Sequence, residues 1–461
     1  MAPLYNFPVE ILLKIFHAVV ETSTDDDICT ERQRYAIILS QVDSTFRSIM
    51  IGTPMMWAYI SISNRRGSWE MANTCYVRSR SCPLHVKIDI QKSTVQLEEI
   101  IVPLKANESR LETLDVRPNS ETQVRLSRAL NRLRTPHLKH LLVSSGSDLP
   151  NDWNLGLLPV ATGIQSLTVH AANPRWQLIN YSGLTTLKMT HTDHLRNVND
   201  LFTILPKFPR LVNLMFQAIS TPSTPRLIEP GFRIELPVLR RLEVTRGPHT
   251  LVQFIISVLH APLLETFHFG MMRYLFVRST DWDTHPFVSF PSVTNFRITT
   301  DDWPYLDVDQ LATFDMFFSR MIQQVPNTIN LTINGSDYLK AWMFHNRKVG
   351  KEALNKMATL TMPSRGKVSQ DEYLTDLKTL RNFLNMRRKF KCERLKHVSI
   401  QTEVKRFGPS SSDWLQQETE LVDSIRAQVD RFDLSIGELG ELEVSSNADY
   451  PRKEVNQLYT M

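Results

Sequence analysis

The chain has 461 residues, of which 42% are apolar and 22% charged, and this composition excludes a largely disordered protein. The formal net charge of +5 is small for this length, and the basic residues are spread along the chain, so composition does not favour nucleic-acid binding. The four cysteines lie far apart without a C-x-x-C spacing. That distribution argues against both a zinc site and a disulfide scaffold, and it favours a reducing compartment.

The start of the chain is apolar, but Glu10 and Lys14 interrupt it and no basic segment precedes it, so we expect no secretory signal peptide. The longest largely apolar stretch elsewhere, Leu251 to Leu259, is about half of the ~20 residues needed to cross a bilayer. We therefore expect no membrane span, and we expect an intracellular protein located in the cytoplasm or nucleus.

Residues 4–62 have the pattern of three short helices. Pro8 stands at the start of the first helix, where its missing N–H costs nothing, and apolar residues then recur at helical spacing. A second apolar stretch covers 35–39, and a third begins near residue 42 and ends before Thr53 and Pro54. Three such helices carry more apolar surface than so small a unit can bury, which indicates a protein partner.

The order of residues in this segment resembles the F-box, a family of adaptor-binding modules. FPVEILLKIF at 7–16 is similar to the family's opening Leu-Pro-x-Glu-Ile-Leu-x-x-Ile-Phe, and LSQVDSTFRSIMIGTPMMWAYISI at 39–62 resembles its closing segment with Thr-Pro-x-x-Trp. WEMANTCYVRSRSCPLHVKIDI, from Trp69, is similar to the segment after the F-box in many large fungal members. The resemblance implies that the adaptor subunit of cullin-based ubiquitin ligases is contacted by Phe7, Pro8, Ile11, Leu12, Val42, Phe46 and Trp57.

The chain departs from the F-box pattern at several positions. Phe7 replaces the usual Leu, Phe46 replaces the usual Trp, and 43–45 replaces a Cys-Arg-Arg type of sequence. These departures imply a weaker affinity for the adaptor than is typical. The alternative is that the same apolar residues pack the module onto the rest of the chain.

A short pattern, apolar-x-x-apolar-x-apolar, recurs eleven times from residue 111 to residue 400. The copies begin at Leu111, Leu138, Ile164, Leu184, Leu211, Leu239, Leu264, Val293, Thr328, Met357 and Leu395. Up to Val293 the starts are 20 to 29 residues apart, which suits one strand and one crossover in each unit. Later steps are longer, so we expect uneven curvature and loops in the C-terminal half.

Proline precedes six of these copies by two residues, and helical spacing occurs between copies at 126–133, 251–259 and 311–325. Because proline cannot donate to a strand ladder and disfavours helix in the residue before it, we expect it to end a helix and begin a strand. Each unit is therefore predicted to be a strand followed by a helix.

Parallel strands joined by such crossovers bury their apolar faces only by stacking on their neighbours. We expect an α/β fold, with the three-helix F-box module followed by a curved β/α solenoid of parallel strands and a C-terminal helical cap. The solenoid resembles the leucine-rich-repeat family, although the Asn or Cys ladder that usually comes after the strand is missing. The expected segments are 1–65 for the module, 66–110 for a linker helix and first strand, 111–405 for the solenoid, and 406–461 for the cap and tail.

Two helices are expected near the C-terminus. The first runs from about Asp371 to a basic end at Arg387, Arg388, Lys389 and Lys391, where cations complement the helix dipole. The second covers 413–432 and is amphipathic, so we expect it to cap the open end of the array.

No residues indicate an enzyme. His191 and His194 lack a third metal ligand at a recognisable spacing, and the acidic groups at 25–27 and 301–302 have the surroundings of solvated loops. Neither a phosphate-binding loop nor a nucleophile signature occurs in the sequence. We therefore expect no catalytic residues, no metal and no cofactor.

In leucine-rich-repeat geometry, the polar residues that alternate with the buried strand positions line an exposed concave sheet. The candidate target-binding residues are His170, Lys188, Thr190, Asn213, Gln217, Arg241, Glu243, His268, Asn295 and Arg297. Their mixed charge suits a protein target more than a polyanion. The hypothesis is a substrate-recognition subunit of an SCF-type ubiquitin ligase. The alternatives are a repeat-based scaffold with no ligase role and, more remotely, a nucleic-acid binder.

Overall fold

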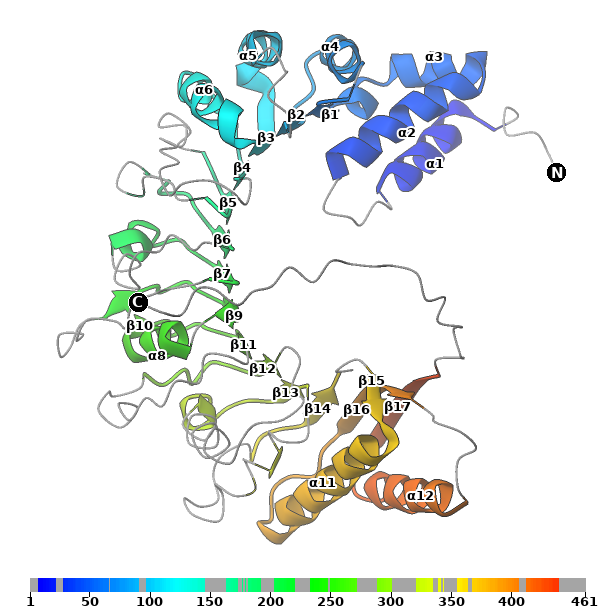
Figure 1. Cartoon of the computed structure of the whole chain (residues 1–461), viewed down its shortest axis with the longest axis vertical. Coiled ribbons are helices and arrows are strands. Elements are labelled where there is room, and N and C mark those ends of the chain that lie inside the picture. The colour runs from blue at the N-terminus through cyan, green and yellow to red at the C-terminus, as the bar shows by residue number, and fades with distance from the viewer. Residues whose placement is uncertain are drawn as a thin grey trace, which may run out of the picture.

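One long, curved, parallel sheet dominates the computed structural model (Figure 1). The sheet has 15 strands, and every pairing between its described strands is parallel. The described residues are 7–21, 28–65, 67–90, 97–145, 163–172, 176, 179, 181–191, 203–219, 233–247, 249–271, 288–300, 321–334, 339–340, 343, 355–363, 367–405 and 412–438. The expected helix at 311–325 falls largely outside these ranges, as do the acidic groups at 25–27 and 301–302.

The strands follow one another along the sheet almost in chain order. They are β1 (Tyr59–Ser63), β2 (Leu84–Ile90), β3 (Leu111–Pro118), β4 (His140–Ser144), β5 (Ser166–His170), β6 (Thr186–Thr190), β7 (Asn213–Gln217), β9 (Arg241–Gly247), β11 (Thr266–Met271), β12 (Asn295–Thr300), β13 (Asn330–Ile333), β14 (Thr359–Met362), β15 (Lys367–Ser369), β16 (His397–Lys405) and β17 (Arg431–Glu438). A separate pair consists of β8 (Ile234–Glu235) and β10 (Leu259–His260).

Helices precede the sheet and also cover its outer side, while the strands line the inner side of the arc (Figure 1). The N-terminal helices are α1 (Val9–Glu21), α2 (Ile28–Val42), α3 (Ser44–Gly52) and the short 3-10 helix η2 (Pro54–Trp57). The later helices are α4 (Ser68–Arg78), α5 (Leu97–Ala106), α6 (Ser120–Leu130), α8 (His249–Val258), α11 (Gln370–Lys389) and α12 (Ser412–Arg426). The fold is therefore mixed α/β, and its form is compatible with a curved solenoid.

All eleven predicted copies of the repeat contain a strand of this sheet. In the copy at Leu138, for example, the leading residue and the next two apolar residues, Leu141 and Val143, are all buried. Because each strand stacks on its neighbours, these buried side chains form one continuous core between the sheet and its outer helices. Burying one such side chain stabilises the fold by roughly 1.5–3 kcal/mol.

Proline has a more specific position than the sequence indicated. In the six proline-containing copies, the N–H of the leading residue donates to the carbonyl of the residue before proline, at 3.1–3.2 Å. In one such turn Pro209 follows Phe208, whose carbonyl accepts from Leu211. Proline thus occupies the second position of a β-turn, where its restricted φ is favourable. The turn, rather than proline alone, sets the start of each strand.

A second recurring backbone feature lies at the C-terminal end of four of the strands. Ala171, His191, Ala218 and Arg246 all have positive φ, between 48° and 53°, although none is glycine. For the first three of these residues, the N–H donates to a carbonyl of the next strand at 2.8 Å. The hydrogen bond offsets part of the cost of this left-handed conformation, which the residue types alone did not predict.

The sheet begins earlier than residue 111, because β1 and β2 already belong to it. Trp57, Ile60 and Ile62 repeat the spacing of the later copies, and all three are buried. The expected 1–65 module therefore contains the first strand of the sheet, and the expected 66–110 linker contains α4, β2 and α5.

The C-terminal end differs from the prediction. The expected helix at 371–391 is present as α11, with a capping box between Ser369 and Glu372. The expected helix at 413–432 ends at Arg426, and the chain then forms β17, which pairs with β16. From Arg431 onward the sequence alternates polar and apolar residues, which is the period of a strand. The prediction that the last helix caps the open end is wrong: α12 packs against α11, and β17 is the final strand.

Candidate functional site

Helix α1 has two apolar faces. Leu12 and Phe16 point into the module and are 1% and 2% exposed, with the Phe16 ring meeting Phe46 edge-on at 4.9 Å. Their neighbours recur at four-residue steps on the other side of the helix. These exposed residues are Phe7, Ile11, Ile15 and Val19, each 38–43% exposed.

Helix α2 extends this exposed apolar surface. It packs beside α1 and runs in the opposite direction, so its end lies near the start of α1 (Figure 1). Ile38 and Val42 are 44% and 58% exposed and are also four residues apart. We call Phe7, Ile11, Ile15, Val19, Ile38 and Val42 the N-terminal apolar stripe. Several large exposed apolar side chains on two neighbouring helices are typical of a surface that a partner covers.

The seven predicted adaptor-binding residues divide into two groups. The exposed residues are Phe7, Pro8, Ile11 and Val42, and the buried residues are Leu12, Phe46 and Trp57. In this conformation the buried three hold the helices together, so their effect on a partner would be indirect. Ile15, Val19 and Ile38 were not predicted as contacts, although four-residue spacing from Ile11 and Val42 was available to find them.

Trp57 shows how firmly the buried group is held. Its indole Nε1 donates to the Met50 carbonyl at 2.7 Å, and the Arg78 guanidinium lies 4.3 Å from the centre of its ring. These contacts join α3, η2 and α4. Trp57 therefore links the N-terminal helices to the outer side of the sheet.

Asp43, one of the departures from the F-box pattern, has a local role. Its Oδ1 accepts a hydrogen bond from the Phe46 N–H at 2.7 Å and so caps the N-terminus of α3. Asp is among the preferred residues for this position, since an unpaired N–H of the first turn gains a partner. The substitution is therefore compatible with a well-formed third helix.

Helix α2 also covers the inner face of the sheet at its N-terminal end (Figure 1). The Gln33 side chain accepts from the Ser61 N–H at 3.3 Å, and Thr30 and Ser61 hydroxyls lie 2.8 Å apart. The Arg32 guanidinium lies 4.4 Å from the centre of the Tyr59 ring. These contacts connect the N-terminal helices directly to β1.

Further along, from β5 to β12, no described helix lies over the inner face (Figure 1), and we call this part the open inner face. It carries the predicted target-binding residues. The strand register places all ten on the face opposite the core, in three adjacent rows. The first row contains Asn213, Arg241 and Asn295; the central row contains Lys188, Glu243, His268 and Arg297; the third contains His170, Thr190 and Gln217. All are exposed or half-buried except Thr190, which is 4% exposed.

Two polar clusters occur on this open part. Glu243 lies between Arg241 at 3.3 Å and the His268 ring at 3.4 Å, and the hydrogen bond from His268 holds the pKa of its carboxyl below the ordinary value. His170 bonds the Thr190 hydroxyl at 2.7 Å and meets the His191 ring edge-on at 5.0 Å. Partial burial, with nearby cationic side chains adding to it, lowers the pKa of His170.

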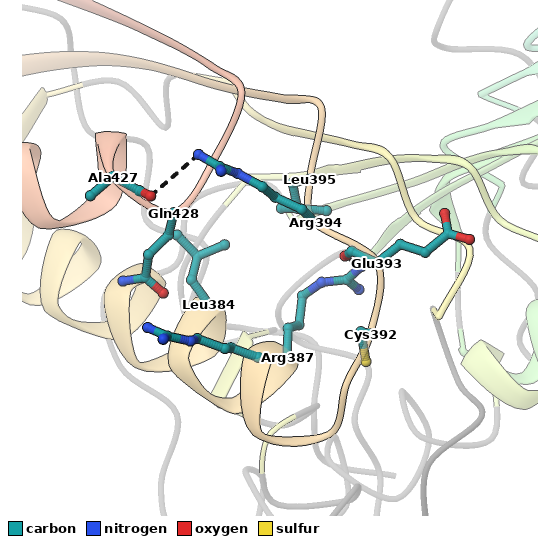
Figure 2. A pocket seen from close by; sticks show the side chains of 9 residues that line it. Leu384, Arg387, Cys392, Glu393, Arg394, Leu395, Ala427 and Gln428 are labelled. Carbon is teal, nitrogen blue, oxygen red and sulfur yellow. Dashed lines mark hydrogen bonds between the residues drawn. The ribbon is translucent and has the colours of Figure 1, made fainter.

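A cavity of about 420 Å³ lies near the ends of α11 and α12 (Figure 2). Two of its arginines donate to backbone carbonyls. Arg387 donates to Met357 and Glu393, and Arg394 donates to Ala427, the last of these bonds being drawn in Figure 2. Arg387, in the basic last turn of α11, therefore joins neighbouring chain segments, a structural role beyond complementing the helix dipole.

Within the described ranges, no three His, Cys, Asp or Glu side chains gather as metal ligands would. His194, the second member of the histidine pair, lies outside those ranges. None of the described helices is both long and apolar enough to cross a membrane. No protein-family model and no curated protein matches the sequence.

Proposed function

We propose that the chain is the substrate-recognition subunit of a cullin-based, SCF-type ubiquitin ligase. The N-terminal helices act as an F-box that binds the adaptor subunit, and the sheet acts as a leucine-rich-repeat-like solenoid that binds a target protein. Ubiquitin transfer is carried out by the other subunits, and this chain brings the target near them in the cytoplasm or nucleus.

The observation that carries the proposal is the N-terminal apolar stripe. Six large apolar side chains, on or next to two antiparallel helices, lie outside a core that already contains Leu12, Phe16 and Phe46. Leaving such a surface in water is unfavourable at about 25 cal/mol per Å² of apolar area, so a partner that covers it gains that free energy. The resemblance of 7–16 and 39–62 to the F-box supports the adaptor as this partner.

The contacts of α2 support a division of labour between two surfaces. One side of the N-terminal helices carries the stripe, while α2 bonds to β1 through Gln33 and Thr30. The adaptor-binding surface and the open inner face are thus held in one fixed relation. A substrate-recognition subunit needs such a relation, because the target must be held at a constant distance from the transferring subunit.

The test is co-purification with the adaptor. Replacing Ile11 and Val42 together by Asp puts two charges into the stripe at side chains 39% and 58% exposed, so the fold should be kept while adaptor binding is lost. Val77→Asp is the matched control, because Val77 is 78% exposed on α4, away from the stripe. Leu12 is unsuitable for this purpose, since its side chain belongs to the core.

The expected result is that wild type and Val77→Asp retain the adaptor and the double variant does not, with unchanged circular dichroism in all three. Wild-type protein that fails to retain the adaptor, or a double variant that still does, would overturn the ligase proposal. The remaining hypothesis would then be a repeat-based scaffold without a ligase role.

A further inference from the structure

The open inner face from β5 to β12 has an excess of positive charge among its described residues. Glu243 is the one carboxylate in the central row there, and it is already engaged by Arg241 and His268. Lys188 and Arg297, in the same row, have no carboxylate oxygen within 4 Å among the residues that the structure describes. Among the described residues, these two cations are therefore the ones on this row that an acidic group of a partner could meet.

The surroundings of these cations are mostly polar and uncharged, although Met215 lies beside Lys188 in the same row. Hydroxyl and amide side chains at the neighbouring positions are half-buried and include Thr168, Thr186, Asn213, Gln217, Thr245, Thr266, Asn295 and Thr299. Such groups donate and accept hydrogen bonds without adding charge. The face thus suits a polar polypeptide whose acidic groups meet the two cations.

The strand register gives the separation of the two cations. Lys188 on β6 and Arg297 on β12 lie in one row, with β7, β9 and β11 between them. Four steps of about 4.8 Å between neighbouring strands place them roughly 19 Å apart. An extended polypeptide rises about 3.3 Å per residue, so it would cover this distance in about six residues.

The type of anion can be inferred from the same arrangement. Phosphorylated side chains of a target are usually bound by clusters of arginines. Here Lys188 and Arg297 are separated by three strands, so each is a single cation. Nucleic-acid binding depends on neutralising many backbone phosphates, whereas two unpaired cations occur among the described residues of this row, and Glu243 between them would repel a continuous polyanion. Two separate carboxylates therefore suit the face better than a phosphate group or a nucleic acid does.

We propose that the open inner face binds an extended acidic segment of a target protein, with Asp or Glu side chains about six residues apart facing Lys188 and Arg297. This inference rests on the proposed function only in one respect, namely that the bound protein is then ubiquitinated by the other subunits. The binding itself depends on the charges and spacing of the face.

The experiment measures binding of fluorescein-labelled peptides to the full chain by fluorescence anisotropy. The first peptide has two glutamates about six residues apart in a Ser/Thr background, and the second has lysines at both places. Wild type should bind the glutamate peptide at least about tenfold more tightly, and Lys188→Glu with Arg297→Glu should reverse this preference. The control, Lys105→Glu with Arg132→Glu, makes the same charge change at exposed residues on and after outer helices and should behave as wild type.

Three results would overturn the inference. The first is equal binding of both peptides by wild type. The second is binding more than about tenfold tighter when phosphoserines replace the glutamates, because that would identify a phosphorylated target. The third is tighter binding of a duplex DNA oligonucleotide with a steep salt dependence.

Adaptor co-purification separates this inference from the proposed function. Lys188→Glu with Arg297→Glu should still retain the adaptor, since neither residue belongs to the N-terminal apolar stripe. Retention of the adaptor without a preference for the acidic peptide would reject the inference alone. Preference for the acidic peptide without adaptor binding would reject the ligase proposal alone.

Discussion

The two ends of one row of residues on the inner face have different environments. Lys87 on β2 and Lys188 on β6 occupy the same position in the repeat, and both alternate with apolar residues of the core. Lys87 is 4% exposed in the part of the sheet nearest α2, while Lys188 is half-buried on the open part. A single repeat pattern thus supplies a buried position at one place and a partly exposed position at another.

Truncating a buried side chain where the N-terminal helices meet the sheet should give the largest loss in the free energy of unfolding. Trp57→Ala removes a ring that is 1% exposed, together with its hydrogen bond to Met50 and its contact with Arg78. We expect a loss of about 3–5 kcal/mol in the free energy of unfolding, measured by urea denaturation. Val77→Ala, at a side chain 78% exposed, is the control and should change stability by less than about 0.5 kcal/mol. Similar losses in both variants would contradict the distinction between covered and open residues.

The two lysines test the comparison directly. Lys87→Ala leaves space in a buried site and removes a cation near Asp89 and beside Asp115, whose pKa is already raised by burial. We expect it to cost about 2–3 kcal/mol in urea denaturation. Lys188→Ala should cost less than about 0.5 kcal/mol, because its side chain is half-exposed. Equal costs would show that α2 makes no difference to this row.

A smaller effect is expected on the open part, where it depends on pH. The pKa of Glu243 is lowered below its ordinary 4.5, chiefly by the hydrogen bond from His268. The ionised form therefore stabilises the fold above pH 4.5, and this contribution is lost as pH falls through the lowered pKa. Glu243→Gln should cost about 0.5 kcal/mol at neutral pH, and the difference from wild type should disappear in acid. Unfolding curves that keep a constant separation at every pH would contradict this assignment.

The strand positions were predictable because their apolar residues recur with one spacing. Leu211, Leu214 and Phe216 are buried together as the pattern requires. The first strand is masked in the sequence because Trp57 fits the F-box pattern and also, with Ile60 and Ile62, the strand pattern. The last strand is masked because the helical spacing of 413–426 runs on into 427–432, while strand alternation begins at Arg431.

The candidate site was predictable in part. Alternation along each strand was enough to place Lys188, Glu243 and Arg297 on the face opposite the core. Helical periodicity identified the apolar residues of α1, but it did not say which of two adjacent residues, Ile11 or Leu12, would be exposed. That choice depends on where α2 and α3 pack against α1.

The sequence by itself determined the repeat, because side chains alternate across a strand and the alternation can be counted residue by residue. Only the tertiary structure decided which repeated positions meet solvent. Gln33 and Thr30 reach Ser61 from a helix about thirty residues earlier in the chain, and the contacts of that helix turn one end of a polar row into interior. Whether a residue is buried depends on which other segments pack against it, and contacts between distant segments have no local signal in the sequence.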